Sequence, residues 1–440
     1  MSSTGADIRS NRLDKAEIDK NFADLHPPLS RSEALIAADR CYFCFDAPCT
    51  TACPTGIDIP GFIQKIRSDN IRGSAHTILA ENIMGGMCAR VCPTEILCEE
   101  ACVRNAHEDK PVEIGLLQRY ATDPIFESST QLFERGESSG KTVAIVGGGP
   151  AGLSCAHRLA MLGHSVKVFS RDDKLGGLNE YGIAAYKTVD DFAQREIEYI
   201  LSIGGIEIKT GVTLGQDFSL SELQEEFDAV FVGIGLASVN DLNIDNEDLP
   251  GVENAIDYIA DLRQAADKSK LPVGRNVVVI GGGMTAIDVA VQSKRLGAEK
   301  VDLVYRRGPD DMSASEFEQH LAQTNGVSVH HWLHPKALHG DGHVSAMEFD
   351  KMGEAVTMPA DIVFKAIGQR LADEQLATEL QDIDLENGRI VVDDSQATSL
   401  EGVWAGGDCV AGGDDLTVSA VQHGKVAAIA IDRYLGGDRG

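Results

Sequence analysis

Eight of the ten cysteines in this 440-residue chain lie between positions 41 and 102, in two groups of four. The first group has the spacing Cys-x2-Cys-x4-Cys-x3-Cys-Pro, and the second reads Cys-x3-Cys-Pro followed by Cys-x3-Cys. Thiolates at this density, with a proline after the last cysteine of a run, are how proteins hold [4Fe–4S] clusters. The spacing therefore predicts two such clusters in the first quarter of the chain.

The spacing also divides the ligands between the clusters. In the bacterial ferredoxin run, the cysteine before the proline binds the other cluster of the pair. The same arrangement assigns Cys41, Cys44 and Cys49 to one cluster. Cys53 then belongs to the other cluster, and Cys102 is the ligand that the second group returns to the first. Structural zinc is the alternative, since zinc sites with four cysteine ligands use similar spacings, but the Cys-Pro ending favours iron–sulfur.

A glycine-rich fingerprint starts at position 147, after a strand expected over 142–146 and before a helix expected over 150–162. Its glycines allow a tight turn and a close approach to a pyrophosphate, which meets the free N–H groups of the helix start. The next strand, 165–169, ends in a serine where an acid usually binds the ribose. We expect an FAD site here. Its candidate residues are Gly147, Gly148, Gly149, Pro150, Ala151, Gly152 and Ser170.

Three later segments fit the same flavin site. Gly177 and Leu178 lie in a loop expected near the isoalloxazine ring. Asp408 follows an apolar strand and is a candidate for the ribityl or pyrophosphate part of FAD, a simple turn or cap role being the alternative. A helix expected from about Thr417 would direct its positive N-terminal end at the flavin and favour the reduced anion.

A second fingerprint starts at position 281, between a strand expected over 276–280 and a helix expected over 285–296. Alanine at its third position is accepted in nicotinamide dinucleotide sites. The following strand, 300–305, ends in two arginines, which at this place can hold the 2′-phosphate of NADPH. Contact with adenine or solvent is the alternative and suits NADH equally. The candidate residues are Gly281, Gly282, Gly283, Met284, Thr285, Ala286, Arg306, Arg307, Ala366, Ile367 and Gly368.

The composition limits the partners. A formal net charge of −29 argues against binding of nucleic acid or of an anionic membrane surface. No apolar run reaches the roughly 20 residues that a membrane helix needs, and the N-terminus lacks an apolar signal core. We therefore expect a cytoplasmic protein, in which thiols stay reduced and a metal site is favoured over disulfides.

Together these patterns predict a multidomain protein. An α-helical N-terminal domain with two [4Fe–4S] clusters is followed by two Rossmann-like α/β nucleotide-binding domains. We expect the iron–sulfur domain over residues 1–136, the FAD-binding domain over 137–262 and 372–440, and the NAD(P)-binding domain over 263–371. The FAD domain is thus discontinuous around the NAD(P) domain. Residues 131–141 read as a linker, and 61–70 and 75–83 as amphipathic helices.

Over nearly its whole length the chain resembles the NAD(P)H-oxidising module shared by dihydropyrimidine dehydrogenases and the small subunit of glutamate synthase. The match is closer to the dihydropyrimidine dehydrogenases. It rests on Asp46-Ala-Pro-Cys49, on Cys53-Pro-Thr-Gly-Ile-Asp-Ile-Pro60 and on Cys88-Ala-Arg-Val-Cys92-Pro-Thr.

The resemblance implies an activity. Hydride would pass from NADH or NADPH to FAD, and single electrons would pass through two [4Fe–4S] clusters to a partner subunit. That partner would carry FMN and further clusters and reduce uracil or thymine, so a hetero-oligomer is expected. Alone, the chain would show only diaphorase activity. A glutamate synthase small subunit, a ferredoxin-coupled NAD(P)H oxidoreductase and a non-enzymatic redox sensor are the alternatives.

The resemblance also implies individual residues. It gives the first cluster Cys41, Cys44, Cys49 and Cys102, and the second cluster Cys53, Cys92, Cys98 and an unusual fourth ligand, Gln118. Cys88 is then left over, although spacing alone prefers it to a glutamine. For FAD the resemblance adds Val91 and Lys187. Ser313 stands where the animal enzymes have a second arginine for the 2′-phosphate, so NADH is as plausible as NADPH. We expect no catalytic acid or base, since the cofactors supply the chemistry.

Overall fold

The computed structural model describes residues 13–128, 130–236, 238–371 and 374–437. Backbone contacts divide the chain into two compact units. Unit 1 comprises residues 1–25, 181–189 and 239–369, and unit 2 comprises 26–180, 190–238 and 370–440. The chain therefore passes from one unit to the other five times. The domain boundaries expected above stay predictions, and the boundary residue 372 lies outside the described residues.

Helices form the first part of unit 2. Helix α4 (Ile59–Arg67) shows why: its apolar residues recur at helical spacing, and Phe62, Ile63 and Ile66 are fully buried against neighbouring helices. The Asp58 carboxylate caps its start by accepting from the Gly61 N–H. The other helices are α2 (Arg31–Asp39), α3 (Pro48–Thr51), α5 (Ile71–Glu81), α6 (Gly85–Val91), η1 (Thr94–Ile96), α7 (Asn105–Glu108) and α8 (Ile114–Ser128). The two expected amphipathic helices are confirmed as α4 and α5, each beginning earlier than predicted.

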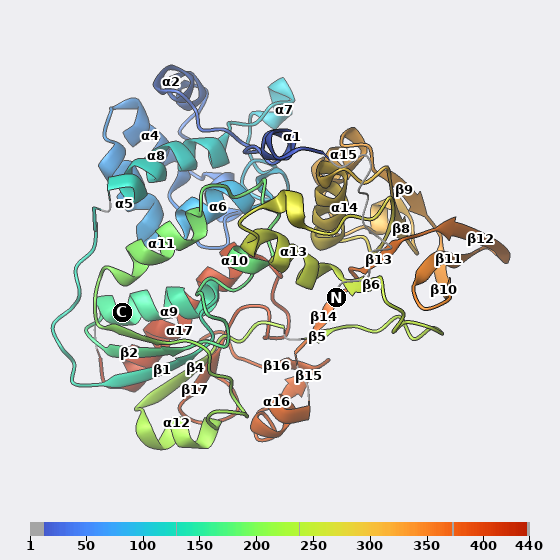
Figure 1. Cartoon of the computed structure of the whole chain (residues 1–440). Coiled ribbons are helices and arrows are strands. Elements are labelled where there is room, and N and C mark those ends of the chain that lie inside the picture. The colour runs from blue at the N-terminus through green and yellow to red at the C-terminus, as the bar shows by residue number, and fades with distance from the viewer. Residues whose placement is uncertain (1–12, 129, 237, 372–373, 438–440) are drawn as a thin grey trace. The chain divides into compact units, whose positions relative to one another are not determined.

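A parallel sheet forms the second part of unit 2, in the strand order β17-β4-β1-β2-β3. Helices α9 (Pro150–Met161) and α17 (Thr417–Tyr434) cover one face, as Figure 1 shows. The other face packs against α12 (Leu220–Glu226) and against Leu371, Leu376, Leu380, Ile383 and Ile390. The remaining elements are β1 (Thr142–Val146), β2 (Ser165–Phe169), β3 (Ile206–Lys209), β4 (Ala229–Val232), β17 (Val403–Ala405), α10 (Leu178–Tyr181), α11 (Phe192–Leu201), α16 (Glu374–Glu379), β15 (Leu385–Glu386) and β16 (Arg389–Ile390).

Unit 1 is built on a second parallel sheet, in the order β6-β13-β7-β8-β9. Helices α13 (Ala255–Gln264), α14 (Met284–Leu296) and α15 (Glu316–Thr324) contribute to the apolar core on one face. An antiparallel sheet packs on the other face, formed by β10 (His334–Gly340), β11 (Val344–Lys351) and β12 (Glu354–Pro359). The remaining elements are β6 (Val252–Asn254), β7 (Asn276–Ile280), β8 (Lys300–Tyr305), β9 (Ser328–His331), β13 (Ile362–Lys365), η2 (Lys268–Lys270) and η3 (Pro309–Asp311). The short strands β5 (Ser238–Val239) and β14 (Gln369–Arg370) lie where the chain passes between the units.

The N-terminal helix α1 (Lys15–Asn21) belongs to the core of unit 1. Ile18 is 1% exposed, and Phe22 is buried beside it. The Asn21 side-chain amide donates to the Arg295 carbonyl at 3.0 Å, and the Arg295 guanidinium donates to the Asn21 carbonyl at 2.9 Å. The polar composition of this segment gave no sign of the contact, because only one short face of the helix is apolar.

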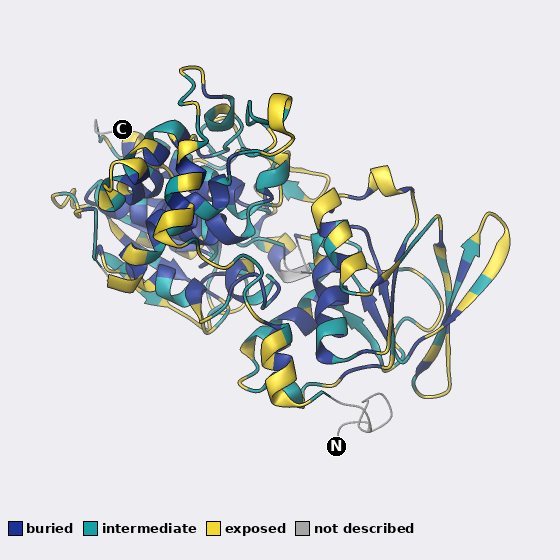
Figure 2. Cartoon of the chain, turned by 90° about the horizontal axis from the view of Figure 1, so that it is seen from above, coloured by how far each residue is buried: buried dark blue, intermediate teal, exposed yellow. Residues whose placement is uncertain are grey.

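The predicted fold class is confirmed: a helical segment is followed by two Rossmann-like α/β sheets. Figure 2 shows buried residues running through the helices and strands and exposed residues on their outer faces. Within the described residues, none of the helices combines the length and the apolar character that crossing a bilayer requires.

Candidate functional site

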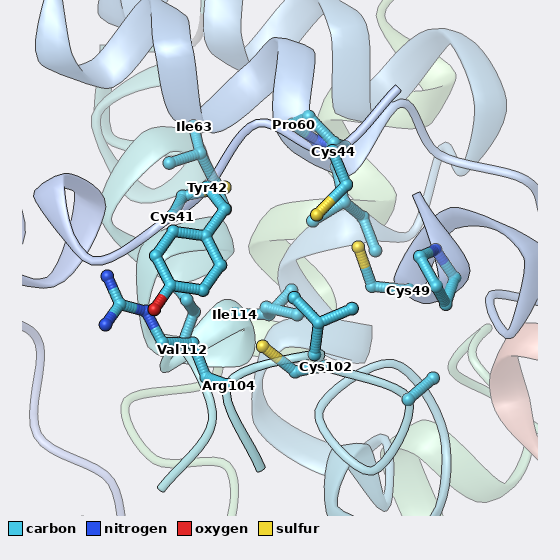
Figure 3. Close-up of a pocket in the computed structure, with 14 residues that line it drawn as sticks. Cys41, Tyr42, Cys44, Cys49, Pro60, Ile63, Cys102, Arg104, Val112 and Ile114 are labelled. Atoms are coloured by element: carbon cyan, nitrogen blue, oxygen red, sulfur yellow. The ribbon is translucent and has the colours of Figure 1, made fainter. Parts of the chain in front are cut away.

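Cys41, Cys44, Cys49 and Cys102 line one pocket in unit 2. In Figure 3 the sulfur atoms of Cys44, Cys49 and Cys102 point into the same space. The four come from three places: the loop after α2, helix α3 and the turn before α7. The fold therefore brings together the four residues predicted for the first cluster. Most of the remaining lining is apolar: Pro48, Ile59, Pro60, Ile63, Val112 and Ile114.

Burial makes this pocket unfavourable for free thiolates. It raises the pKa of Cys49 to about 11 and also raises the pKa of Cys41. Thiolate is nevertheless the form that binds metal. The cationic iron of a cluster supplies the charge that the apolar surroundings lack, so the donor set fits a [4Fe–4S] cluster.

Within the part of the chain that the structure describes, no three His, Cys, Asp or Glu side chains stand close enough to hold one metal ion. A zinc site with four cysteine ligands gathers their sulfurs around a single ion, at about 2.3 Å each. In a [4Fe–4S] cluster each cysteine binds a different iron, so the sulfurs stand further apart. The two kinds of site therefore differ in the distances between the ligand sulfurs.

Cys53, Cys92 and Cys98 form a second group beside the first. Cys53 and Cys98 pack against the same apolar core as the first group. Electrostatic repulsion from Cys53 and Cys98 contributes to raising the pKa of Cys92, and Cys49 has the same effect on Cys98. Three of the predicted ligands of the second cluster are thus neighbours.

Cys88 is buried on α6, and the Cys92 N–H donates to its carbonyl at 3.0 Å. Interaction with the Cys88 side chain, and then burial, raise the pKa of Cys92. Cys88 therefore lies beside the second group as well.

Gln118 lies on α8 and is buried. Its side-chain Nε2 donates to the Gly85 carbonyl at 2.6 Å. The amide is thus anchored through its NH₂ group, and Oε1 is the atom of this side chain that can bind a cation.

The side chain of Glu196, on α11, is hydrogen bonded to the first turn of α6. This helix contains Val91 and ends just before Cys92. The Glu196 carboxylate accepts from the N–H groups of Gly86 at 2.8 Å and Met87 at 3.0 Å. Burial raises the pKa of Glu196 to about 8. Sequence reasoning missed this residue, because a lone glutamate in an amphipathic helix carries no pattern.

The first fingerprint is the turn between β1 and α9. Gly149 is the residue before the first turn of α9, so the free N–H groups of that turn follow it directly. The Gly176 N–H donates to the Gly148 carbonyl at 2.7 Å, which holds the loop containing Gly177 and Leu178 against the fingerprint. Ser170 is buried beside the same turn, since a β-carbon on Gly148 would lie 3.1 Å from its Oγ. The fold thus gathers these flavin candidates at one end of the sheet.

Asp408 and Thr417 come from the C-terminal part of unit 2. The segment before Asp408 lies against the start of α9, because a β-carbon on Gly407 would be 3.2 Å from the Ala151 Cβ. Burial raises the pKa of Asp408 to about 6. The Thr417 hydroxyl donates to the Asn179 Oδ1 at 2.6 Å, joining the start of α17 to α10. Both candidates therefore belong to the same neighbourhood as the fingerprint.

Lys187 lies in the segment 181–189, which belongs to unit 1. Its Nζ is 2.7 Å from the Asp288 carboxylate and 2.7 Å from the Glu318 carboxylate. These buried charges raise the pKa of Lys187, although burial itself opposes them. Within unit 1, Lys187 is thus joined to α14 and α15, and its role in binding FAD stays a prediction.

The second fingerprint lies between β7 and α14. The Ala366 N–H donates to the Ile280 carbonyl at 2.8 Å, so residues 366–368 lie beside the turn at 281–283. The Ala314 N–H donates to the Gly282 carbonyl at 3.1 Å and brings Ser313 against Gly283. Arg306 and Arg307 are exposed at the end of β8, on the same edge of the sheet. The nicotinamide candidates therefore lie together at this edge: Gly281 to Ala286, Arg306 and Arg307, and Ala366 to Gly368.

Two further residues beside the second cysteine group were not predicted. The Thr55 hydroxyl lies 3.3 Å from the Cys53 Sγ. Lys425 of α17 donates to the Thr55 carbonyl at 2.9 Å and pairs with Glu81 at 2.8 Å. The available signals were the threonine in the Cys-Pro-Thr run and a lysine inside an apolar helix.

Two family models match this chain. The family model for pyridine nucleotide-disulphide oxidoreductases matches residues 141–424. The family model described as dihydropyrimidine dehydrogenase domain II, 4Fe-4S cluster, matches residues 18–130.

Two relatives match along almost their whole length. One is the NAD-dependent dihydropyrimidine dehydrogenase subunit PreT homolog of Salmonella typhi, 36% identical over 94% of this chain and 98% of that protein. Another is the glutamate synthase [NADPH] small chain of Escherichia coli (strain K12), 34% identical over 94% of each chain. Among solved structures, the thioredoxin reductase of T. acidophilum covers 67% of this chain and 99% of its own, with a TM-score of 0.54 and 20% identity. That likeness shows the fold alone.

Proposed function

Because this chain belongs to the pyridine nucleotide-disulphide oxidoreductase family and is an NAD(P)H-dependent oxidoreductase subunit with FAD and [4Fe–4S] cofactors, we propose that it supplies electrons to a pyrimidine-reducing partner. The partner reduces uracil and thymine to 5,6-dihydropyrimidines. The observation that carries the proposal is the convergence of Cys41, Cys44, Cys49 and Cys102 on one pocket, in a chain that also holds two dinucleotide fingerprints. The name of the 36% identical relative supports the choice of substrate.

Bound FAD would supply the chemistry that converts the two-electron hydride of the nicotinamide into single electrons for the clusters. The residues of the chain bind the cofactors, orient them and shield them from water. The turns at 147 and 281 present backbone N–H groups to the two pyrophosphates. The apolar lining of the cysteine pocket keeps water away from the first cluster.

We assign the second cluster to Cys53, Cys92, Cys98 and Gln118. Support comes from the closeness of the three cysteines and from the burial of Gln118 on α8. The choice of Gln118 over Cys88 rests on the resemblance to the dihydropyrimidine dehydrogenases.

The partner subunit carries FMN, further iron–sulfur clusters and the pyrimidine site. Support comes from the relative's description as a subunit of a dehydrogenase. In isolation the chain passes electrons from NAD(P)H only to artificial acceptors.

An anaerobic titration of the purified protein with NADH and then NADPH tests the electron-transfer step. We expect bleaching of the flavin absorbance, followed by the EPR signal of a reduced cluster, and the more effective nucleotide identifies the physiological donor. Binding without bleaching, or a colourless protein that contains zinc, would overturn the mechanism.

Copurification with the partner tests the substrate. We expect NAD(P)H oxidation that depends on uracil. Oxidation that depends instead on glutamine and 2-oxoglutarate would assign the chain to the glutamate synthase branch, which the 34% identical relative makes the second candidate.

A further inference from the structure

Cys53 has a polar neighbour that the ligand assignment does not use. The Thr55 Oγ1 lies 3.3 Å from the Cys53 Sγ, within hydrogen-bonding distance for sulfur. Thr55 is only 2% exposed, so water does not compete for this contact.

The direction of this hydrogen bond follows from the chemistry of the sulfur. A cysteine that binds iron is a thiolate and has no proton to give. A threonine hydroxyl has one proton and can rotate it toward the acceptor. With a cluster bound, Thr55 is therefore the donor and Cys53 the acceptor.

Lys425 fixes Thr55 in place. Its ammonium group donates to the Thr55 carbonyl at 2.9 Å and pairs with the Glu81 carboxylate at 2.8 Å. Lys425 is 8% exposed and lies on α17, whereas Glu81 ends α5. The turn at Cys53-Pro54-Thr55 is thus fixed by α17, which is itself joined to α5 through the ion pair of Lys425 with Glu81.

We propose that Thr55, positioned by Lys425, raises the reduction potential of the second cluster by donating a hydrogen bond to the Cys53 sulfur. Reduction adds negative charge that spreads onto the ligand sulfurs, so a donor at a sulfur stabilises the reduced form more than the oxidised form. Hydrogen bonds to cluster sulfurs are among the factors that set these potentials. The inference rests on the proposed function, because it takes Cys53 as a cluster ligand. The proposed hydrogen bond from Thr55 makes the second cluster a better electron acceptor.

The test is a redox titration of the full-length holoprotein, followed by EPR. We expect Thr55→Val to lower the midpoint potential of one cluster, changing its electron-transfer equilibrium threefold to tenfold, or about 28–59 mV for one electron. Thr55→Ser keeps the hydroxyl and should restore the wild-type value. Lys425→Met should shift the same cluster in the same direction, since Thr55 loses its anchor.

Thr77→Val is the matched control, because the Thr77 hydroxyl donates to the Gly73 carbonyl of its own helix at 3.0 Å. It should leave both potentials unchanged. Two intact cluster signals with an unmoved midpoint in Thr55→Val would overturn the inference and leave the proposed function standing. A wild-type protein that shows no second cluster would instead refute the ligand assignment itself. A shift in Thr55→Ser as large as in Thr55→Val would also contradict the inference, because the hydroxyl is then not its cause.

Discussion

At the residue scale, Cys88 and Gln118 are the two candidates for the fourth ligand of the second cluster. Cys88 has the better donor atom for iron, whereas the resemblance to the dihydropyrimidine dehydrogenases favours Gln118. Cys88 interacts with Cys92, and the Gln118 amide donates to the Gly85 carbonyl at 2.6 Å. An iron ligand must reach its own metal atom, so substitutions at the two positions show which residue binds.

Single substitutions separate these two residues. Cys88→Ala should leave both cluster signals in the EPR spectrum of the reduced protein. Gln118→Ala should abolish or alter one of them, because one iron loses its protein ligand. Iron content measured on the same samples checks the result. The reverse pattern would make Cys88 the ligand, and a Gln118→Cys protein with unchanged spectrum and potential would count against the glutamine.

The residue scale also shows what sequence can and cannot provide. The four cysteines of the first pocket were predicted from spacing and resemblance, because a cluster requires one residue type in a dense pattern. Glu196 and Lys425 were not predicted, because their roles depend on partners more than 100 residues away in sequence. No local pattern marks such a contact.

At the element scale, the turn between β1 and α9 must allow close packing of the helix and also leave room for a ligand. Gly152 lies where the helix packs on the turn: a β-carbon there would be 2.0 Å from the Gly147 carbonyl oxygen. Gly149 lies where the helix meets open space, and the nearest atom to its β-carbon would be 3.9 Å away. The first glycine serves the protein fold, and the second leaves room for a ligand.

These two glycines should therefore respond differently to alanine. Gly152→Ala should lower the melting temperature of the flavin-free protein, since overpacking typically costs about 1–3 kcal/mol. Gly149→Ala should leave that melting temperature near wild type and reduce the FAD content per chain, because the methyl group blocks the pyrophosphate. Melting curves of the apoprotein and flavin absorbance of the holoprotein measure the two effects. Equal destabilisation by both variants would contradict this division of roles.

Regular elements were the most predictable part of the fold. The strands β1, β2, β7 and β8 were predicted with the bounds that the structure has, because each is a short apolar run followed by glycine or charged residues. The antiparallel strands β10–β12 were not predicted, since their apolar residues alternate only in part and face one side.

At the scale of the whole molecule, unit 1 is assembled from three separate stretches of chain. Helix α1 is the first of them and contributes Ile18 and Phe22 to the core around α14. Sequence alone placed this segment with the cluster domain, because neighbours in sequence are usually neighbours in space.

Ile18→Ala tests the contribution of this helix. A buried isoleucine replaced by alanine typically costs about 2–5 kcal/mol, so unit 1 should melt at lower temperature and bind NADH less well after mild heating. Lys20→Ala, an exposed position of the same helix, is the control and should have little effect. The EPR signals of the clusters should persist in both variants. Loss of the clusters in Ile18→Ala would show that α1 supports unit 2 instead.

The location of α1 has a consequence for the order of biosynthesis. Helix α1 ends at Asn21, and its partner α14 begins at Met284, 284 − 21 = 263 residues later. At the ribosomal rate of about 5–20 residues per second, roughly 13–50 seconds separate the two. During that time the segment that contains the predicted cluster ligands, residues 41–118, is translated, whereas Ile18 and Phe22 still lack the core around α14. The nascent chain can therefore complete its metal-binding helices before its first helix finds its native place.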